Sequence, residues 1–96
     1  MDAHRIAEER SLALHAEVAL RLQDDPRLLE VPREHVQRQL AAGRGVWYAE
    51  AWRDLLDGPL QDLVAVLHDP GEHGRAMRQA TPFAGIVRPR RRWQIW

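Results

Sequence analysis

The sequence contains no cysteine and no lysine, and it has only one serine and one threonine. Without cysteine, disulfide bonds, thiolate chemistry and cysteine-based zinc sites are excluded, and a cytoplasmic location is the default expectation. Its apolar stretches are only a few residues long, far short of the roughly 20 residues that a membrane span needs. The start of the chain, MDAHRIAEER, has no basic region followed by an apolar run, so no secretory signal is predicted.

Charge of both signs is present in equal amounts, but it is unevenly spread. Residues 1–80 carry ten arginines and fourteen acidic residues, a net charge of −4, whereas residues 81–96 carry four arginines and no acid, a net charge of +4. Guanidinium groups suit pairing with carboxylates and phosphates. An arginine-biased genome also explains the missing lysines, and it is the simpler explanation, so their absence says little about function.

A chain of 96 residues, 45% apolar and 29% charged, has the size and composition of one soluble domain, which we place at residues 1–96. Because so short a chain buries only about 60–65% of its unfolded surface, nearly every large apolar side chain must join one core. Alternation of apolar and polar residues never persists without a proline or glycine, so no strand is predicted. The expected fold is all-α, a compact bundle of about five to six short helices.

Proline and glycine mark where these helices should begin and end. Proline is favoured at the first helical position, and a preceding aspartate or threonine can cap the exposed N–H groups. Proline stands at a possible helix start in Asp25-Pro26, Gly58-Pro59, Asp69-Pro70, Thr81-Pro82 and Arg88-Pro89. Asp69 with Glu72 also resembles a capping box, while Gly43 and Gly58 fall where helices should end.

The spacing of apolar residues predicts helices over residues 3–23, 26–42, 46–57, 59–68 and 70–80, with a link around Phe83 and a last helix from Pro89. Pro32 should kink or split the second helix. The third has the clearest apolar face, formed by Tyr48, Ala51, Trp52, Leu55 and Leu56. Trp47 cannot share that face, so it should point outward or lie at the helix start. On the first helix His15 should be half-buried at the edge of the core.

The histidines, at positions 4, 15, 35, 68 and 73, do not form the paired spacing of a zinc helix such as H-E-x-x-H. Ser11 lies inside a predicted helix, and Thr81 is better used as a cap. No glycine-flanked elbow exposes a nucleophile, and the glycines around Arg44 are too close together for a phosphate loop. We therefore predict no metal, no cofactor and no catalytic residue, and do not expect an enzyme.

The final segment, TPFAGIVRPRRRWQIW (residues 81–96), combines four arginines with two tryptophans. Arginines can neutralise phosphates and tryptophans can stack on bases, so nucleic-acid binding is one interpretation. Trp93 and Trp96 share one face of a short helix that is marginal alone and must pack on this domain or on another chain. Tryptophan and arginine often anchor protein interfaces, so binding of a protein partner is a second interpretation. The sequence is equally compatible with a third, in which all four tryptophans simply pack into the core.

Four stretches resemble a group of small uncharacterised bacterial proteins: EERSLALHAEVALRL (8–22), DPRLL (25–29), YAEAWRDLLDGPLQDLVAVL (48–67) and RQATPFAGIVRPRRRW (78–93). The shared order is S-L-A-x-H, an aspartate-proline helix start, Y-x-x-x-W-x-x-(I/L)-L, and R-Q-x-(S/T)-P-F-A-G before a basic helix with tryptophan. The matching positions are Ser11, Leu12, His15, Tyr48, Trp52, Gln79, Pro82, Phe83, Gly85 and Trp93. Pro32 and Arg88 depart from the pattern, because a continuous helix and a capping serine or threonine are expected there.

Genes for the resembled proteins lie beside AbiEii/AbiGii-type nucleotidyltransferase toxins, and the resemblance therefore implies an antitoxin-like partner. The predicted function is a helical protein-binding module acting on such a toxin. The expected partner-binding residues are Phe83, Arg88, Arg90, Arg91, Arg92, Trp93 and Trp96. A nucleic-acid-binding regulator that uses the C-terminal arginines and tryptophans is the first alternative, and a homo-oligomeric structural module is the second. No membrane association is expected.

Overall fold

The computed structural model describes residues 2–84 and residue 86. Over these residues the chain is all-α, as the sequence predicts, and no strand occurs among them. The elements are α1 (Ala3–Asp24), the 3-10 helix η1 (Pro26–Leu29), α2 (Glu30–Ala41), α3 (Val46–Asp57), α4 (Leu60–His68) and α5 (Glu72–Gln79). The final helix predicted from Pro89 lies outside the described residues.

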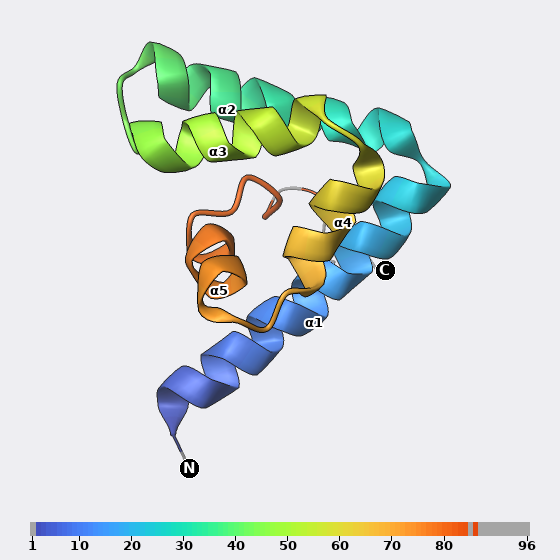
Figure 1. The fold of residues 1–96 in the computed structure, drawn as a ribbon, viewed down its shortest axis with the longest axis vertical. Coiled ribbons are helices and arrows are strands. Elements are labelled where there is room, and N and C mark those ends of the chain that lie inside the picture. The colour runs from blue at the N-terminus through green and yellow to red at the C-terminus, as the bar shows by residue number, and fades with distance from the viewer. Residues whose placement is uncertain (1, 85, 87–96) are drawn as a thin grey trace, which may run out of the picture.

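The helices form two packed groups (Figure 1). α2 and α3 lie side by side as a hairpin at one end of the molecule, while α4 packs against α1 and α5 packs against both α4 and α1. The long helix α1 runs diagonally, and its first turns extend away from the hairpin toward the N-terminus. The buried residues of α1, which are His15, Val18, Ala19 and Leu22, accordingly lie in its C-terminal half.

Local signals set some of the helix ends. The Asp2 carboxylate accepts from the His4 N–H at the start of α1. At the end of α2, Gly43 has a φ of +68°, a left-handed conformation that favours glycine. The Gly43 N–H donates to the Leu40 carbonyl at 3.1 Å and the Arg44 N–H to the Gln39 carbonyl at 3.0 Å, which is the bonding pattern of a Schellman motif. Gly43 thus ends α2, as predicted.

Pro32 does not kink the interior of a helix. The predicted helix over residues 26–42 is instead divided into η1 and α2, and α2 begins at Glu30. Pro32 is then the third residue of α2, and the first N–H groups of a helix have no intrahelical acceptor anyway. The proline costs α2 no hydrogen bond, and its buried ring contributes apolar surface.

Two further predicted helix starts shift. α5 begins at Glu72 rather than at Pro70, and α4 at Leu60 rather than at Pro59. Thr81-Pro82 begins no helix in the described residues. It leads into a turn in which the Ile86 N–H donates to the Phe83 carbonyl at 3.0 Å.

One core joins the two helix groups. Its largest apolar members are Trp52 and Phe83, surrounded by Val18, Ala19, Leu22, Val36, Ala49, Leu56, Leu63, Leu67 and Met77. The predicted inward positions of α3 and α4 are confirmed at Trp52, Leu56, Leu63 and Leu67. At ~25 cal/mol per Å² of apolar surface, burial of these side chains is the main stabilising term of the fold.

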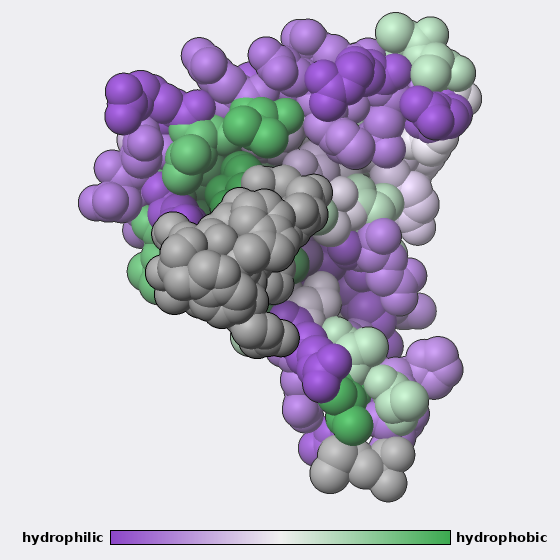
Figure 2. Space-filling view, turned by 180° about the vertical axis from the view of Figure 1, so that it is seen from behind, coloured by the Kyte–Doolittle hydropathy of each residue, from purple (hydrophilic) through white to green (hydrophobic). Residues whose placement is uncertain are grey.

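The outer surface is mostly hydrophilic. The view from behind shows polar residues over much of the molecule, with hydrophobic residues both in its upper half and near its lower end (Figure 2). In the part of the chain that the structure describes, no helix is both long enough and apolar enough to cross a membrane.

Candidate functional site

The predicted partner-binding residues divide into two groups. Arg88, Arg90, Arg91, Arg92, Trp93 and Trp96 lie outside the described residues. Phe83 is described, and its side chain is 0% exposed. The expectation that Phe83 contacts a partner directly is therefore wrong, because the ring is fully buried against the other core residues.

Phe83 is the centre of a junction between three segments that are far apart in the sequence. Its ring meets that of Trp52 from α3 edge-to-face, with centroids 5.4 Å apart and planes at 77°. The His15 ring from α1 approaches Phe83 at 6.4 Å and 88°. Such edge-to-face pairs place the positive ring edge against the negative face of the neighbour. We call these residues, with Thr81, the Phe83 junction.

His15 ties α1 to the segment that follows α5. The Ser11 carbonyl, 2.7 Å from Nδ1, can only accept, so Nδ1 carries the proton and donates to it. Nε2 then accepts from the Thr81 hydroxyl at 2.8 Å. The Thr81 oxygen in turn accepts from the Phe83 N–H at 3.0 Å. Both ring nitrogens are thus bonded although the side chain is 1% exposed, which corrects the expectation of a half-buried ring.

Burial is the main influence on the protonation of His15. It lowers the pKa of the imidazole below its ordinary value, and the positive charge of Arg78 lowers the pKa further. The hydrogen bond to the Ser11 carbonyl acts in the opposite direction and raises the pKa. A hydroxyl bonded to a neutral imidazole resembles a nucleophile with its general base. At 1% exposure, however, the ring is closed to a substrate, and its role is to hold the Thr81–Phe83 segment on α1.

A second buried basic group lies at the contact between α4 and α5. Arg78 is 2% exposed, and its Nη1 donates to the backbone carbonyl of Asp69 at 2.5 Å and, more weakly, to that of Val66 at 3.4 Å. Among the described residues, its Nε and Nη2 have no hydrogen-bond partner. Burial lowers the pKa of Arg78, the Asp69 carboxylate raises it, and the positive charge of Arg75 lowers it.

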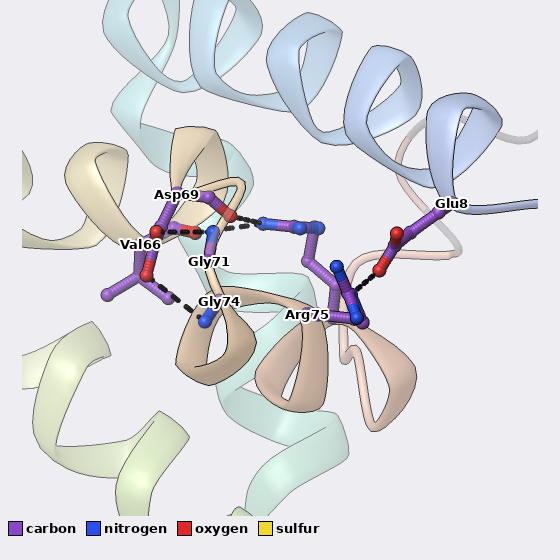
Figure 3. A network of polar contacts seen from close by, with 7 residues as sticks. Glu8, Val66, Asp69, Gly71, Gly74 and Arg75 are labelled. Carbon is purple, nitrogen blue, oxygen red and sulfur yellow. Dashed lines mark hydrogen bonds and ion pairs between the residues drawn. The ribbon is translucent and has the colours of Figure 1, made fainter. Parts of the chain in front are cut away.

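Asp69 positions both Arg78 and the start of α5. Its carboxylate accepts from the Gly71 N–H at 2.8 Å and from the Gly74 N–H at 3.1 Å. Asp69 thus binds N–H groups at the start of α5, but the N-cap of this helix is Gly71, which makes no side-chain cap bond, so the predicted capping box of Asp69 with Glu72 is not formed. A Cβ atom at Gly74 would lie 2.3 Å from the Asp69 carbonyl oxygen and 2.6 Å from the Asp69 Cβ. Glycine at position 74 therefore permits the close approach that brings the Asp69 carbonyl within reach of Arg78. Figure 3 shows Asp69 beside both glycines.

A pocket of about 140 Å³ lies between α1 and α5. Its α1 wall is a single helix face, because the lining residues recur at three- and four-residue intervals: His4, Ala7, Glu8 and Ser11. Its α5 wall consists of Arg75, Arg78 and Gln79. Glu8 crosses from α1 to form an ion pair with Arg75 (Figure 3). We call this space the α1–α5 pocket.

Trp47 is the large apolar residue most open to solvent on α3. It is 62% exposed, which confirms that it points away from the core. Its ring stacks edge-to-face on that of Tyr48 at 4.6 Å and 84°, and Val46 beside it is 43% exposed. Exposed tryptophans are frequent anchors of protein interfaces, so this end of the α2–α3 hairpin is one surface on which a partner can pack.

Two other kinds of site, a metal site and a second pocket, have little support among the described residues. No group of three or more histidine, aspartate or glutamate side chains there is arranged to hold a metal ion. A second pocket, of about 120 Å³, lies between α2 and α3 and is lined by Arg33, Val36, Gln37, Arg53, Leu56 and Asp57. Arg33 already donates to the Leu56 carbonyl at 2.8 Å, so its guanidinium serves to hold α2 on α3.

No protein-family model, no curated protein and no solved structure matches this chain. Sequence reasoning identified His15, Thr81, Trp52 and Phe83 as notable but did not join them, and it missed Arg78 altogether. The available signal for Arg78 was its place in the R-Q-x-T-P-F-A-G stretch, whose following residues enter the core.

Proposed function

We propose that this chain is a small helical protein-binding module, the antitoxin-like or accessory partner of a nucleotidyltransferase-type toxin. The observation that supports the proposal most is the position of Phe83. This side chain is locked into the core only five residues before Arg88, the first of the four C-terminal arginines. Because Phe83 is fixed in the core, the basic segment that follows it in the sequence starts from a fixed position, and such a starting point would lower the entropy cost of presenting that segment to a partner.

The partner class comes from the resemblance of the S-L-A-x-H and R-Q-x-T-P-F-A-G stretches to proteins encoded beside such toxins. Their active sites use carboxylates to hold metal and nucleotide. Arg90, Arg91 and Arg92 would pair with those carboxylates through forked, charge-assisted hydrogen bonds, and Trp93 and Trp96 would supply apolar contact area. The toxin would be inhibited because the arginines occupy the space that its metal and nucleotide need.

The test is co-purification of the chain with the toxin encoded by the neighbouring gene. Changing Arg90, Arg91 and Arg92 together to Glu should abolish the complex, since three attractive pairs become three repulsive ones. The far-UV circular dichroism of the domain should stay the same, because the described core contains none of these residues. Recovery of the complex at wild-type yield would overturn the arginine-to-carboxylate mechanism.

A matched control separates specific pairing from overall charge. Arg10, Arg38 and Arg44 are exposed and form no ion pair among the described residues. Changing these three to Glu alters the net charge by the same amount as the C-terminal triple change. The control variant should keep the complex. If both variants lose it equally, the interaction depends on net charge alone and the proposed docking by the C-terminal segment is wrong.

Nucleic-acid binding is the second candidate, and the net charge of +4 over residues 81–96 favours it. It predicts a mobility shift with RNA or DNA that weakens steeply as salt rises, because each neutralised phosphate releases counterions. The same two triple variants discriminate here, since only the C-terminal one should lose the shift. No shift at low salt would eliminate this candidate.

A further inference from the structure

We infer that the α1–α5 pocket is a binding site for a small oxyanion, the phosphate or carboxylate group of a ligand, held by the guanidinium of Arg78. The C-terminal arginines are not among its residues, and the site goes beyond the proposed function. It is carried by three observations on described residues: an open volume, a buried guanidinium with unused donors, and an excess of positive charge on the walls.

The first observation is the incomplete bonding of Arg78. Its Nη1 is engaged by the carbonyls of Asp69 and Val66, while Nε and Nη2 are buried without a partner among the described residues. Buried polar groups are normally hydrogen-bonded, and a buried donor left without an acceptor costs free energy. Two unused donors on one buried side chain therefore indicate a missing acceptor.

The second observation is the geometry of these two donors. The Nε–H and Nη2–H bonds of a guanidinium lie along one edge and point the same way, which is the arrangement that binds both oxygens of a carboxylate or phosphate. The third nitrogen of this planar group, Nη1, is held by the carbonyls of Val66 and Asp69 at the end of α4. Arg78 is at the same time part of the wall of the α1–α5 pocket.

The third observation is the composition of the pocket. Two arginines, Arg75 and Arg78, face a single acid, Glu8, so the lining carries a formal charge of +1. Ser11 and Gln79 add neutral hydrogen-bonding groups. A water molecule takes up about 30 Å³ in the liquid, so a space of about 140 Å³ has room for a group of about five heavy atoms, the size of a phosphate ion.

The ion pair between Glu8 and Arg75 is part of the pocket lining. The Arg75 side chain is 48% exposed and that of Glu8 is 28% exposed, so both can change rotamer at little cost, whereas Arg78 is held in place by backbone carbonyls. An entering oxyanion would displace the Glu8 carboxylate from Arg75 and gain both guanidinium groups. Glu8 is thus a competitor for the same cation, and Glu8→Gln should tighten oxyanion binding about three- to tenfold by removing that competition.

The experiment follows the side-chain Nε–H resonances of arginine in ¹⁵N-labelled protein during titration with sodium phosphate and, separately, with sodium acetate. Sodium chloride at equal ionic strength is the reference. We expect the Arg78 resonance to shift and saturate with at least one oxyanion and not with chloride. Saturation with phosphate alone assigns a phosphate-bearing ligand, and saturation with acetate alone assigns a carboxylate. Shifts no larger than those in chloride with both salts would overturn the inference.

Two variants that change no charged residue test whether the oxyanion binds in the pocket. Ala7 lines the pocket, and Ala13 lies on the same helix, exposed and outside it. Ala7→Leu should fill the space and remove the saturable shift, whereas Ala13→Leu should leave the shift unchanged. Full binding by Ala7→Leu would show that the oxyanion binds elsewhere and would overturn the assignment. Because this pair leaves Arg78 intact, the test does not depend on whether a variant of that buried arginine folds.

Discussion

The Phe83 junction and the α1–α5 pocket lie next to each other along α1, and each contains a buried basic side chain. In the junction, His15 has both ring nitrogens bonded, to Ser11 and to Thr81. Beside the pocket, Arg78 uses only Nη1, and its two other nitrogen groups have no partner among the described residues. The same degree of burial therefore accompanies opposite degrees of hydrogen-bond satisfaction.

This difference separates a structural role from a binding role. A buried group whose hydrogen bonds are complete has nothing left to offer a ligand, and it contributes to stability by joining distant segments. A buried cation with unused donors lowers the stability of the protein without a ligand. The free energy of that protein should therefore fall when an anion binds to those donors. We therefore expect changes in the junction to affect mainly folding, and changes at the pocket to affect mainly binding.

The largest expected effect is the loss of the Phe83 ring. Phe83→Ala should lower the free energy of unfolding by about 3–5 kcal/mol, because it removes buried surface and leaves a cavity beside Trp52. Trp47→Ala on the exposed face of α3 is the matched control and should change stability by less than about 1 kcal/mol. Urea unfolding followed by tryptophan fluorescence and circular dichroism measures both. Similar losses in the two variants would mean that Phe83 is no more important to the core than a surface aromatic residue.

The second largest effect on stability is expected for Gly74→Ala. Alanine is normally the better helix former by about 1 kcal/mol, but here the new methyl group would meet the Asp69 carbonyl and side chain. We expect a net loss of about 1–3 kcal/mol from overpacking. His73→Ala, an exposed position on the same helix, should be neutral or slightly stabilising. A more stable Gly74→Ala variant would refute the close contact that brings Asp69 to Arg78.

The pH dependence of stability tests the junction. Burial lowers the pKa of His15, so in weak acid the unfolded chain binds a proton more readily than the folded one. The stability due to the neutral ring is fully present above the unfolded value of 6.5 and is lost as the pH falls toward the lower pKa of the folded protein. Within that window the expected slope is up to about 1.4 kcal/mol per pH unit.

Urea titrations between neutral pH and pH 5 measure this slope. His15→Gln should remove the contribution, whereas the control His73→Ala should retain it, because His15 is intact in that variant. An unchanged slope in His15→Gln would assign the pH dependence to other groups and would remove the argument for a neutral His15.

The smallest effect on stability is expected at the pocket rim. Glu8→Gln breaks the ion pair with Arg75, yet partly exposed ion pairs contribute only about 0–1 kcal/mol. Thermal unfolding should therefore change by a few degrees at most, while oxyanion binding should become tighter. A loss of several kcal/mol would show that Glu8 is a structural counter-ion, and the contrast between pocket and junction would then fail.

Much of the fold could be predicted because helix ends depend on nearby residues. α3 was predicted over residues 46–57 and is found at Val46–Asp57, since its apolar face and its flanking glycines are local features. The position of Pro32 was harder to interpret, because the same residue breaks a helix from inside but is harmless in the first turn. The effect of the proline depends on the residue at which α2 begins.

The candidate sites were less predictable for a physical reason. Thr81 reaches His15 across 66 residues of sequence, and no local pattern contains such a contact. Arg78 is held by backbone carbonyls of Val66 and Asp69, which every residue possesses, so the pairing leaves no trace in side-chain chemistry. Phe83 looked available for a partner because its apolar character alone does not reveal which surface covers it.

Periodicity, proline and glycine were enough to specify an all-α chain and to give the approximate limits of its helices, because backbone hydrogen bonding in a helix involves residues three or four positions apart. Packing decided everything that joins distant segments: the complete burial of His15 and Phe83, the close approach at Gly74, and the unused donors of Arg78 beside a pocket. Those features depend on how the helices pack against one another, so they are visible only in the tertiary structure.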